Sequence, residues 1–338
     1  MRLPLVPRWL IVALLAVGLA LLCAVPFFPT VIYPIFVMRI MCMALFACAF
    51  NILLGQTGIL SFGHAAFFGG AAYITGYGLR DMGLPPELSI LMGMAFATVL
   101  GALFGALATR RSGIYLAMIT LALSQLVYFV FLRLPFTHAE DGMQGIPRGT
   151  LFGLVDLRSD TNLYFVVMII VGLGLAMVYR IVHSPFGEVL RAIRDHEPRT
   201  VSLGYPVARY KILAFALSAG LSGLAGSLKV LIYQVASLRD VHWSMSGDVI
   251  LMTLLGGMNS VLGPVIGAGI VSAVYYYFAA LGGWVTVMVG TVFIVCVLVF
   301  RRGVVGSLGA LVAPARQPVS PSSPAISKEN ENATHRTR

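Results

Sequence analysis

Charged side chains are scarce in this sequence: they make up 11% of the 338 residues, whereas a soluble domain carries about 25%. Apolar residues make up 59% of the chain. This imbalance excludes an ordinary soluble domain. It predicts an all-α, polytopic membrane protein whose helices pack together in one bundle.

Apolar runs long enough to span a bilayer, about 17–25 residues each, recur along the chain. The run 246–281 is too long for one crossing and is interrupted at 256–260, so we expect two crossings there. The first run lacks a small-x-small cleavage site before Pro26, so we interpret it as a helix. About ten transmembrane segments are therefore expected: 9–25, 31–54, 59–79, 88–108, 113–133, 161–182, 207–235, two within 246–281, and 284–300.

The sequence also lacks the motifs of nucleotide binding and of intramembrane catalysis. Gly-(x)4-Gly-Lys-[Ser/Thr] does not occur, and the glycines within 220–229 have the wrong spacing for it. Neither His-Glu-x-x-His nor paired carboxylates occur within the apolar runs. The four cysteines lie in apolar runs without metal-ligand spacing: Cys23, Cys42, Cys48 and Cys296. We therefore expect no cofactor, no metal and no enzymatic activity in this chain.

One apolar stretch, 51–70, combines five glycines with polar side chains. Polar groups are costly in hydrocarbon unless they face other helices or water, and irregular backbone survives there only when covered. The stretch predicts a helix broken near Gly55–Gly58 on the wall of a transport pathway. Its candidate lining residues are Asn51, Gln56, Thr57, Ser61 and His64, with Asn259 from the second interrupted run. His64 has two interpretations, a hydrogen-bonded packing element or a lining residue.

Lys and Arg cluster in segments that we expect to be cytoplasmic: the N-terminus, Arg110-Arg111, the segment 180–211 and the stretch that begins at Arg301-Arg302. The loops 80–87, 134–160 and 236–245 carry mixed charge and should face outward. The net charge of +10 then reflects this bias rather than nucleic-acid binding. We expect a transmembrane domain over 1–303 and a mostly disordered cytoplasmic tail over 304–338.

The segment 183–206 is the longest polar interval expected on the cytoplasmic side. Phe186, Val189, Leu190 and Ile193 recur at helical spacing, and Pro198 should divide the segment into two short helices. The opposite face carries Glu188, Arg191, Arg194 and Asp195. Such a helix either lies on the bilayer or docks its apolar stripe into a groove of a soluble partner.

Five sequence blocks, spread from about residue 40 to 303, resemble the LivM-type permeases of branched-chain amino-acid ABC importers. One block joins His183-Ser-Pro-Phe-Gly187 and Leu190-Arg-Ala-Ile-Arg194 to Leu203-Gly-Tyr205 and Arg209-Tyr-Lys-Ile-Leu-Ala-Phe-Ala-Leu-Ser-Ala219. The others are Gly58-Ile-Leu-Ser-Phe-Gly-His-Ala-Ala-Phe-Phe68, Ile114-Tyr-Leu-Ala-Met-Ile-Thr-Leu-Ala122, Glu140-Asp-Gly-Met-Gln-Gly-Ile-Pro147 and Leu254-Leu-Gly-Gly-Met-Asn-Ser-Val-Leu-Gly-Pro264.

The resemblance implies one subunit of a larger importer in a bacterial inner membrane, with both termini cytoplasmic. Its partners would be a second, LivH-type permease, two cytoplasmic ATPases that bind ATP and Mg, and a periplasmic substrate-binding protein. The segment 183–206 would be the coupling loop. Its contacts with the ATPase would be Phe186, Glu188, Leu190, Arg191, Ile193, Arg194, Glu197 and Gly204. The broader importer pattern Glu-Ala-Ala-(x)3-Gly is poorly kept, because Pro198 follows Glu197.

The resemblance also suggests binding-protein contacts at Glu140, Asp141 and Asp248. Without it, the loop 134–160 reads as a solvated cover over helix ends, and Asp248 as an interfacial or helix-capping carboxylate. The cargo expected is a branched-chain or other small apolar amino acid. Related permeases carry urea, short amides and other small solutes. A self-sufficient secondary transporter is the alternative from another class.

Overall fold

The computed structural model describes residues 18, 22–27, 33–258, 260–279, 282 and 284–299. Most of the apolar run 9–25, residue Asn259 and the expected tail 304–338 lie outside the described residues. Elements are η1 Val25–Phe27, α2 Pro34–Asn51, η2 Ile52–Thr57, α3 His64–Arg80, α4 Pro86–Ala108, α5 Ile114–Arg133, η3 Pro135–Thr137, η4 Ala139–Asp141, β1 Met143–Gln144, β2 Thr150–Leu151, β3 Val155–Asp156, α6 Asp160–Val182, α7 Pro185–Ser202, α8 Val207–Tyr233, β4 Val235–Ala236, α9 Leu238–Val241, α10 Trp243–Gly256, α11 Gly263–Tyr277 and α12 Trp284–Val299.

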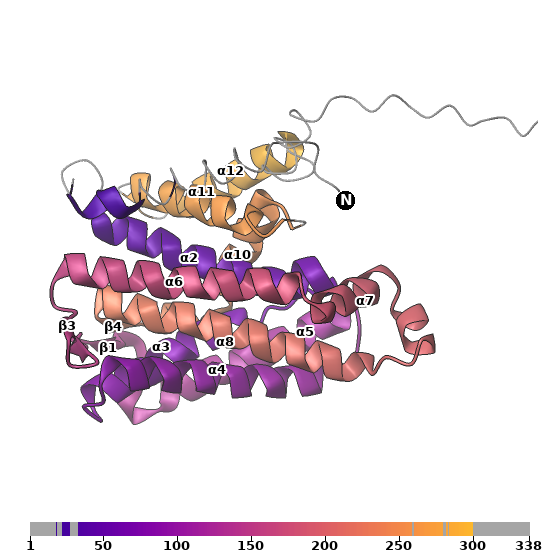
Figure 1. Cartoon of the computed structure of the whole chain (residues 1–338), viewed down its shortest axis with the longest axis horizontal. Coiled ribbons are helices and arrows are strands. Elements are labelled where there is room, and N and C mark those ends of the chain that lie inside the picture. Colours follow the sequence, from indigo (N-terminus) through magenta and orange to yellow (C-terminus); the bar gives the residue numbers. More distant parts are fainter. Residues whose placement is uncertain are drawn as a thin grey trace, which may run out of the picture.

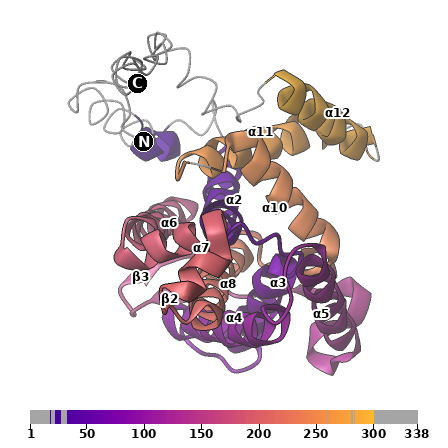
Figure 2. The same cartoon turned by 90° about the vertical axis from the view of Figure 1, so that its right-hand side faces the viewer.

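The long helices α2, α3, α4, α6 and α8 lie side by side, and α7 lies at one end of this bundle (Figure 1). Viewed from the α7 end, α8 is surrounded by α2, α3, α4 and α6, while α5 and α12 lie at the periphery (Figure 2). The expected all-α membrane bundle is thereby confirmed.

Five helices of the described chain are long and apolar enough to cross a membrane: Pro34–Thr57, α4, α5, α6 and α8. In Pro34–Thr57 and in α8, 78% of the most apolar 18-residue stretch is buried, whereas in α4, α5 and α6 the share is 28–33%. Leu103 of α4 and Leu173 of α6 are 55% and 67% exposed. Apolar side chains exposed in this way are stable only against lipid or another apolar surface.

The segment after α8 differs from the expected outward loop and crossing. It turns back into the bundle, where α9 packs against Gly69 of α3. Helix α10 then runs across the bundle rather than along it (Figures 1 and 2). Its 14 residues give a length of about 21 Å, short of the roughly 30 Å of a bilayer core. The two crossings expected within 246–281 are therefore not confirmed, since α11 is similarly short at 15 residues.

Two small antiparallel sheets close the end opposite α7. β1 pairs with β4, with Met143 opposite Ala236, and β2 pairs with β3 in a hairpin. The Phe152 N–H donates to Glu87 Oε2 at 3.3 Å, which ties the segment 134–160 to the start of α4. The loops 80–87 and 134–160 thus share one end, as expected from their charges, while the orientation of that end in the membrane stays a prediction.

Close contact between α8 and its neighbours depends on small residues. A Cβ on Gly226 would collide with the Phe68 carbonyl of α3, and one on Gly101 of α4 would collide with Ala219. Small residues let membrane helices approach closely and gain van der Waals contact. Small residues therefore form the faces through which α4 and α8 pack on their neighbours.

Gly226→Ala should lower the thermal stability of the protein in detergent, because the added methyl group forces α8 away from α3. Overpacking of this kind costs about 1–3 kcal/mol. The control is Gly172→Ala in α6, where a Cβ meets nothing within 4 Å. It should be neutral or slightly stabilising, since alanine loses less backbone entropy on folding. Equal melting temperatures for the two variants would contradict this packing argument.

Candidate functional site

The second helix ends in an irregular segment at the predicted place. After Asn51 the chain forms a π-helical turn, Ile52–Thr57, and Gly58 adopts a left-handed conformation with φ of 70°. The Leu53 carbonyl accepts hydrogen bonds from the N–H groups of Gly58 and, at 3.1 Å, Ile59. Regular helix resumes only at His64. We call residues 52–63 the helix break.

The helix break reaches the middle of the bundle and is covered by other helices. His64, directly after it, contacts Ser218 near the middle of α8. The Phe62 N–H donates to Thr120 Oγ1 of α5 at 3.1 Å, and Ser246 Oγ of α10 donates to the Phe62 carbonyl at 2.8 Å. Side chains of neighbouring helices thus bond to the backbone groups of the break that have no partner within a helix. Irregular backbone inside a membrane requires such partners.

His64 is fully buried and forms part of a bridge between three helices. Its Nε2 lies 2.9 Å from Ser218 Oγ, whose hydroxyl donates to the Ala49 carbonyl at 2.6 Å. Because that hydroxyl has one proton, His64 must donate through Nε2. Its Nδ1 is then an acceptor with no partner among the described residues. Phe50 and Phe67 pack edge-on against the ring. These contacts are those of a packing element, and a lining role stays a prediction.

Ser218→Ala should destabilise the protein, because it removes both bonds of the bridge and leaves the His64 Nε2–H unpaired. Hydrogen bonds between membrane helices contribute about 0.6 kcal/mol on average and up to about 1.7. We expect a loss of about 1–2 kcal/mol, measured as a lower melting temperature. In the control, Ser222→Ala, the lost hydroxyl donates only to the Ser218 carbonyl of its own helix. A Ser218 variant as stable as the Ser222 variant would argue against the bridge.

The other predicted lining residues that the structure describes are also buried: Asn51, Gln56, Thr57 and Ser61 are 0–6% exposed. Asn51 Nδ2 donates to the Ser260 carbonyl at 3.2 Å, whereas Asn51 Oδ1 and Gln56 Oε1 have no partner among the described residues. Thr57 bonds to the Leu53 carbonyl, and Ser61 Oγ accepts from the Gly63 N–H at 3.2 Å. The structure gathers all five on one segment but does not place them around one open channel.

A cavity of about 750 Å³ lies beside the helix break at the α7 end. Its walls come from the break (Thr57–Leu60 and Phe62), from residues between 112 and 121 at the start of α5, from 193–198 of α7, and from Lys211 of α8. Thr57 is the predicted lining residue among its walls. The break therefore has protein on one side and open space on the other.

Helix α7 is divided as expected. Ser184 caps its start, accepting from the Gly187 N–H at 3.4 Å. The helix is interrupted at His196, whose φ of −160° and ψ of 88° are not helical. This residue lies two positions before Pro198, which lacks an N–H and crowds the preceding backbone. The poorly kept family pattern thus coincides with a kink between two short helices.

The apolar stripe of α7 packs on this chain itself, which corrects the docking hypothesis. Leu190 and Ile193 are 0% and 3% exposed, so they cannot enter a partner's groove while α7 holds this position. Phe186 stacks on Tyr210 of α8 with ring centroids 5.6 Å apart. The exposed apolar residues lie instead after the kink: Val201, Leu203 and Tyr205 are 55%, 69% and 43% exposed. Sequence reasoning missed them because they have no helical periodicity.

Three basic side chains fasten α7 to the bundle. Arg194 Nη1 donates to the Gly55 carbonyl of the helix break at 2.5 Å. Arg191 Nη2 donates to the Val182 carbonyl at the end of α6 at 3.2 Å and to Glu188 Oε1 at 2.7 Å. Lys211 of α8 is buried and donates to Glu197 Oε1 at 2.6 Å. Of the expected partner contacts, Glu188, Arg194 and Gly204 remain exposed.

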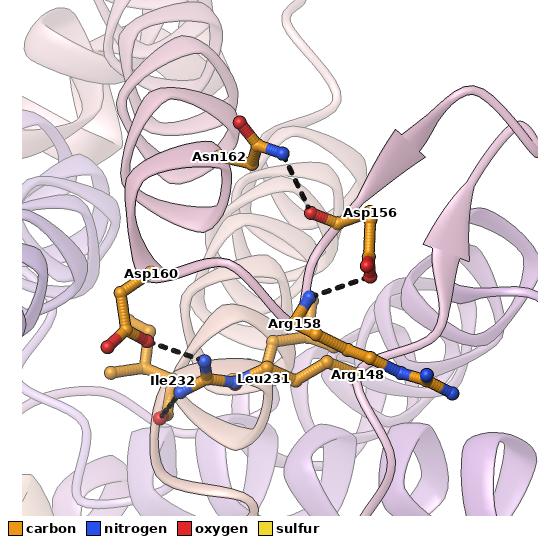
Figure 3. Close-up of polar contacts among 7 residues, drawn as sticks. All are labelled: Arg148, Asp156, Arg158, Asp160, Asn162, Leu231 and Ile232. Carbon is orange, nitrogen blue, oxygen red and sulfur yellow. Dashed lines mark hydrogen bonds and ion pairs between the residues drawn. The ribbon is translucent and has the colours of Figure 1, made fainter.

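At the opposite end, Arg148 holds the long loop in place (Figure 3). Its Nε and Nη2 donate to the carbonyls of Leu231 and Ile232 at 3.0 and 2.9 Å, and its Nη1 contacts Asp160 Oδ1 at 2.7 Å. A cation at the end of α8 satisfies carbonyls that lack helical partners and complements the helix dipole. The loop 134–160 is therefore an ordered cover over α8.

Arg148→Ala should loosen this cover, because three hydrogen bonds are lost at once. Hydrogen–deuterium exchange in peptides from 143–160 should rise at least tenfold while the bundle core stays protected. Arg158→Ala is the matched control, since the exposed Arg158 side chain has no hydrogen bond or ion pair among the described residues, and its N–H still reaches Asp156 (Figure 3). Similar exchange in both variants would contradict the role of Arg148.

The three predicted binding-protein contacts are not equivalent. Glu140 and Asp141 lie exposed in the cover, at the end opposite α7. Asp248 is half-buried on α10, where it accepts a hydrogen bond from the Tyr275 hydroxyl of α11 at 3.0 Å. It does not start an outward-facing crossing, as the sequence had suggested, because α10 runs across the bundle.

Sequence analysis also missed an ion pair. Lys229 of α8 contacts Asp240 of α9, and their side chains are 17% and 9% exposed. Asp240 further belongs to a capping box with Ser237. The sequence feature that could have indicated this ion pair is Lys229, a lysine inside the apolar run 207–235. Among the described residues, no three His, Cys, Asp or Glu side chains gather as a metal site would require.

A bundle of apolar helices, with an irregular segment between α2 and α3 and with α10 lying crosswise, defines a polytopic membrane protein. The chain belongs to the family of permease components of branched-chain amino acid transport systems, which it matches over residues 33–300. The resemblance drawn from the sequence blocks is thereby confirmed.

Among known proteins, the high-affinity branched-chain amino acid transport system permease proteins LivM of Salmonella typhimurium and Escherichia coli are each 28% identical over 241 residues. The matched region covers 64% of this chain and 57% of each relative, so this chain matches little more than half of their length. A probable permease protein LivH of Methanocaldococcus jannaschii is 25% identical over 170 residues, covering 48% of each chain. No solved structure matches.

Proposed function

We propose that this chain is one membrane-spanning subunit of an ATP-driven importer of branched-chain or other small apolar amino acids. The observation that carries the proposal is the kinked helix α7, which is fastened to a broken transmembrane helix and presents exposed apolar residues at the end of the bundle. In a self-contained transporter such a surface would have to lie on the bilayer instead. The α7 end would face the cytoplasm of a bacterial inner membrane.

The docking surface in this proposal is Val201, Leu203 and Tyr205 after the kink, flanked by Glu188 and Gly204. Exposed apolar and aromatic side chains with a polar rim are typical of interfaces with a protein partner. The occupant would be a cytoplasmic ATPase that binds ATP and Mg, because this sequence has no phosphate-binding loop of its own. A second permease and a substrate-binding protein at the end opposite α7 would complete the importer.

The cargo would move along the helix break. Asn51 Oδ1, Gln56 Oε1 and His64 Nδ1 are buried atoms without donors among the described residues. Such atoms are rare in folded proteins and call for a partner. The ammonium group of a passing amino acid could supply donors, and the apolar walls would accept its side chain. ATP binding would shift α7 and the break together and open the path alternately to the two sides.

The test is purification of the tagged chain from its own membranes in mild detergent, followed by reconstitution in liposomes. We expect two ATPase chains and a second permease to co-purify. Leucine uptake should then require ATP and the binding protein. Leucine uptake without ATP would overturn the proposal in favour of a secondary transporter. ATP-dependent uptake of urea or an amide, without leucine, would overturn the cargo assignment alone.

A matched pair of variants tests the docking surface in the same preparation. Leu203→Asp should reduce the recovered ATPase at least tenfold, because it places a charge in the apolar contact. Leu154→Asp is the control: Leu154 is 88% exposed at the end opposite α7, and its variant should recover the ATPase normally. Full ATPase recovery with Leu203→Asp would show that this surface rests on the bilayer or on nothing.

A further inference from the structure

We propose that Arg194 is a positioning residue that makes the conformation of the helix break follow the position of α7. Sequence analysis placed Arg194 among the contacts with an ATPase. The structure turns its side chain inward, where about a third of it remains exposed and its guanidinium reaches the Gly55 carbonyl. The inference rests on the proposed function, because it assigns the residue that transmits the movement of α7.

Both the helix break and the Arg194 side chain are shaped for the contact between Arg194 and the Gly55 carbonyl. Gly55 lies in the π-helical turn, so a cation beside its carbonyl meets the negative end of the α2 dipole. The Arg194 stem lies over Gly58, where a Cβ would come within 2.9 Å of Arg194 Cγ. Gly58 also needs its positive φ. The break therefore has one conformation that fits Arg194, and a different position of Arg194 removes the bond that supports it.

Open space beside the helix break allows it to change conformation when α7 moves. The cavity of about 750 Å³ adjoins both Arg194 and the break at Thr57–Leu60 and Phe62. Packed interiors resist displacement, whereas a segment with open space on one side can change its conformation without compressing its neighbours. Movement of α7 away from the bundle would thus withdraw the guanidinium and release the break toward this cavity.

Arg191 provides an internal comparison. It also lies on α7 and also donates to a carbonyl at a helix end, but that helix is the unbroken α6. If Arg194 only fastened α7 in place, the two arginines would be equivalent. The proposal predicts that they differ, because only Arg194 contacts a segment that is irregular at mid-depth.

The first measurement is hydrogen–deuterium exchange on the full chain in detergent. Arg194→Ala should raise exchange at least tenfold in peptides from 52–63, whereas Arg191→Ala should raise it only near the end of α6. Arg194→Lys should restore part of the protection, because it keeps a cation but loses the planar fork. Unchanged exchange over 52–63 in Arg194→Ala would overturn the proposal, whatever the importer carries.

The second measurement uses the assembled importer in liposomes and compares leucine uptake with ATP hydrolysis. Arg194→Ala should lower uptake per ATP hydrolysed at least fivefold, while Arg191→Ala should change uptake and hydrolysis in proportion. Proportional loss in both variants would show a purely structural role for Arg194. Failure of the proposed function would appear separately, as a wild-type chain that neither assembles with an ATPase nor transports leucine with ATP.

Discussion

The structure depends on satisfying the backbone polar groups of the irregular segment that joins α2 to α3 inside the bundle. Thr120, Ser246 and the Arg194 guanidinium, from three different helices, bond to backbone groups of residues 55–62. In hydrocarbon each unpaired group would cost several kcal/mol. Helices α5, α7 and α10 each supply a partner for a backbone group that neither α2 nor α3 pairs.

The same requirement accounts for the contact of α7 with the bundle, because its Arg194 pairs with a carbonyl of the irregular segment. Its apolar stripe is used internally, and its arginines end two transmembrane helices. A helix held in this way moves together with the bundle rather than as a free docking peptide. The exposed apolar surface at this end is small and follows the kink at His196, where Val201, Leu203 and Tyr205 are 55%, 69% and 43% exposed. At this end, the residues before the kink pack on the bundle, and the apolar residues after it are exposed.

Much of the fold was predictable from the sequence because hydrophobic length and glycine content are local signals. Long apolar runs identified α4, α5, α6 and α8, and the mixture of glycine with polar residues at 51–64 located the helix break. Pro198 predicted the division of α7 for a local steric reason. Where the sequence failed, the deciding contact was distant: α10 is as apolar as a crossing helix, yet its path is set by Ser246 against Phe62, far away in the chain.

Amino-acid order alone therefore determined that this is a helical membrane permease with one interrupted helix, since transfer into hydrocarbon depends on composition over about 20 residues. The tertiary structure decided which faces are buried. An amphipathic stripe such as Leu190 and Ile193 has the same pattern whether it covers its own bundle or a partner. The contact of Arg194 with the Gly55 carbonyl likewise joins residues 139 positions apart in the chain, and no local sequence pattern predicts it.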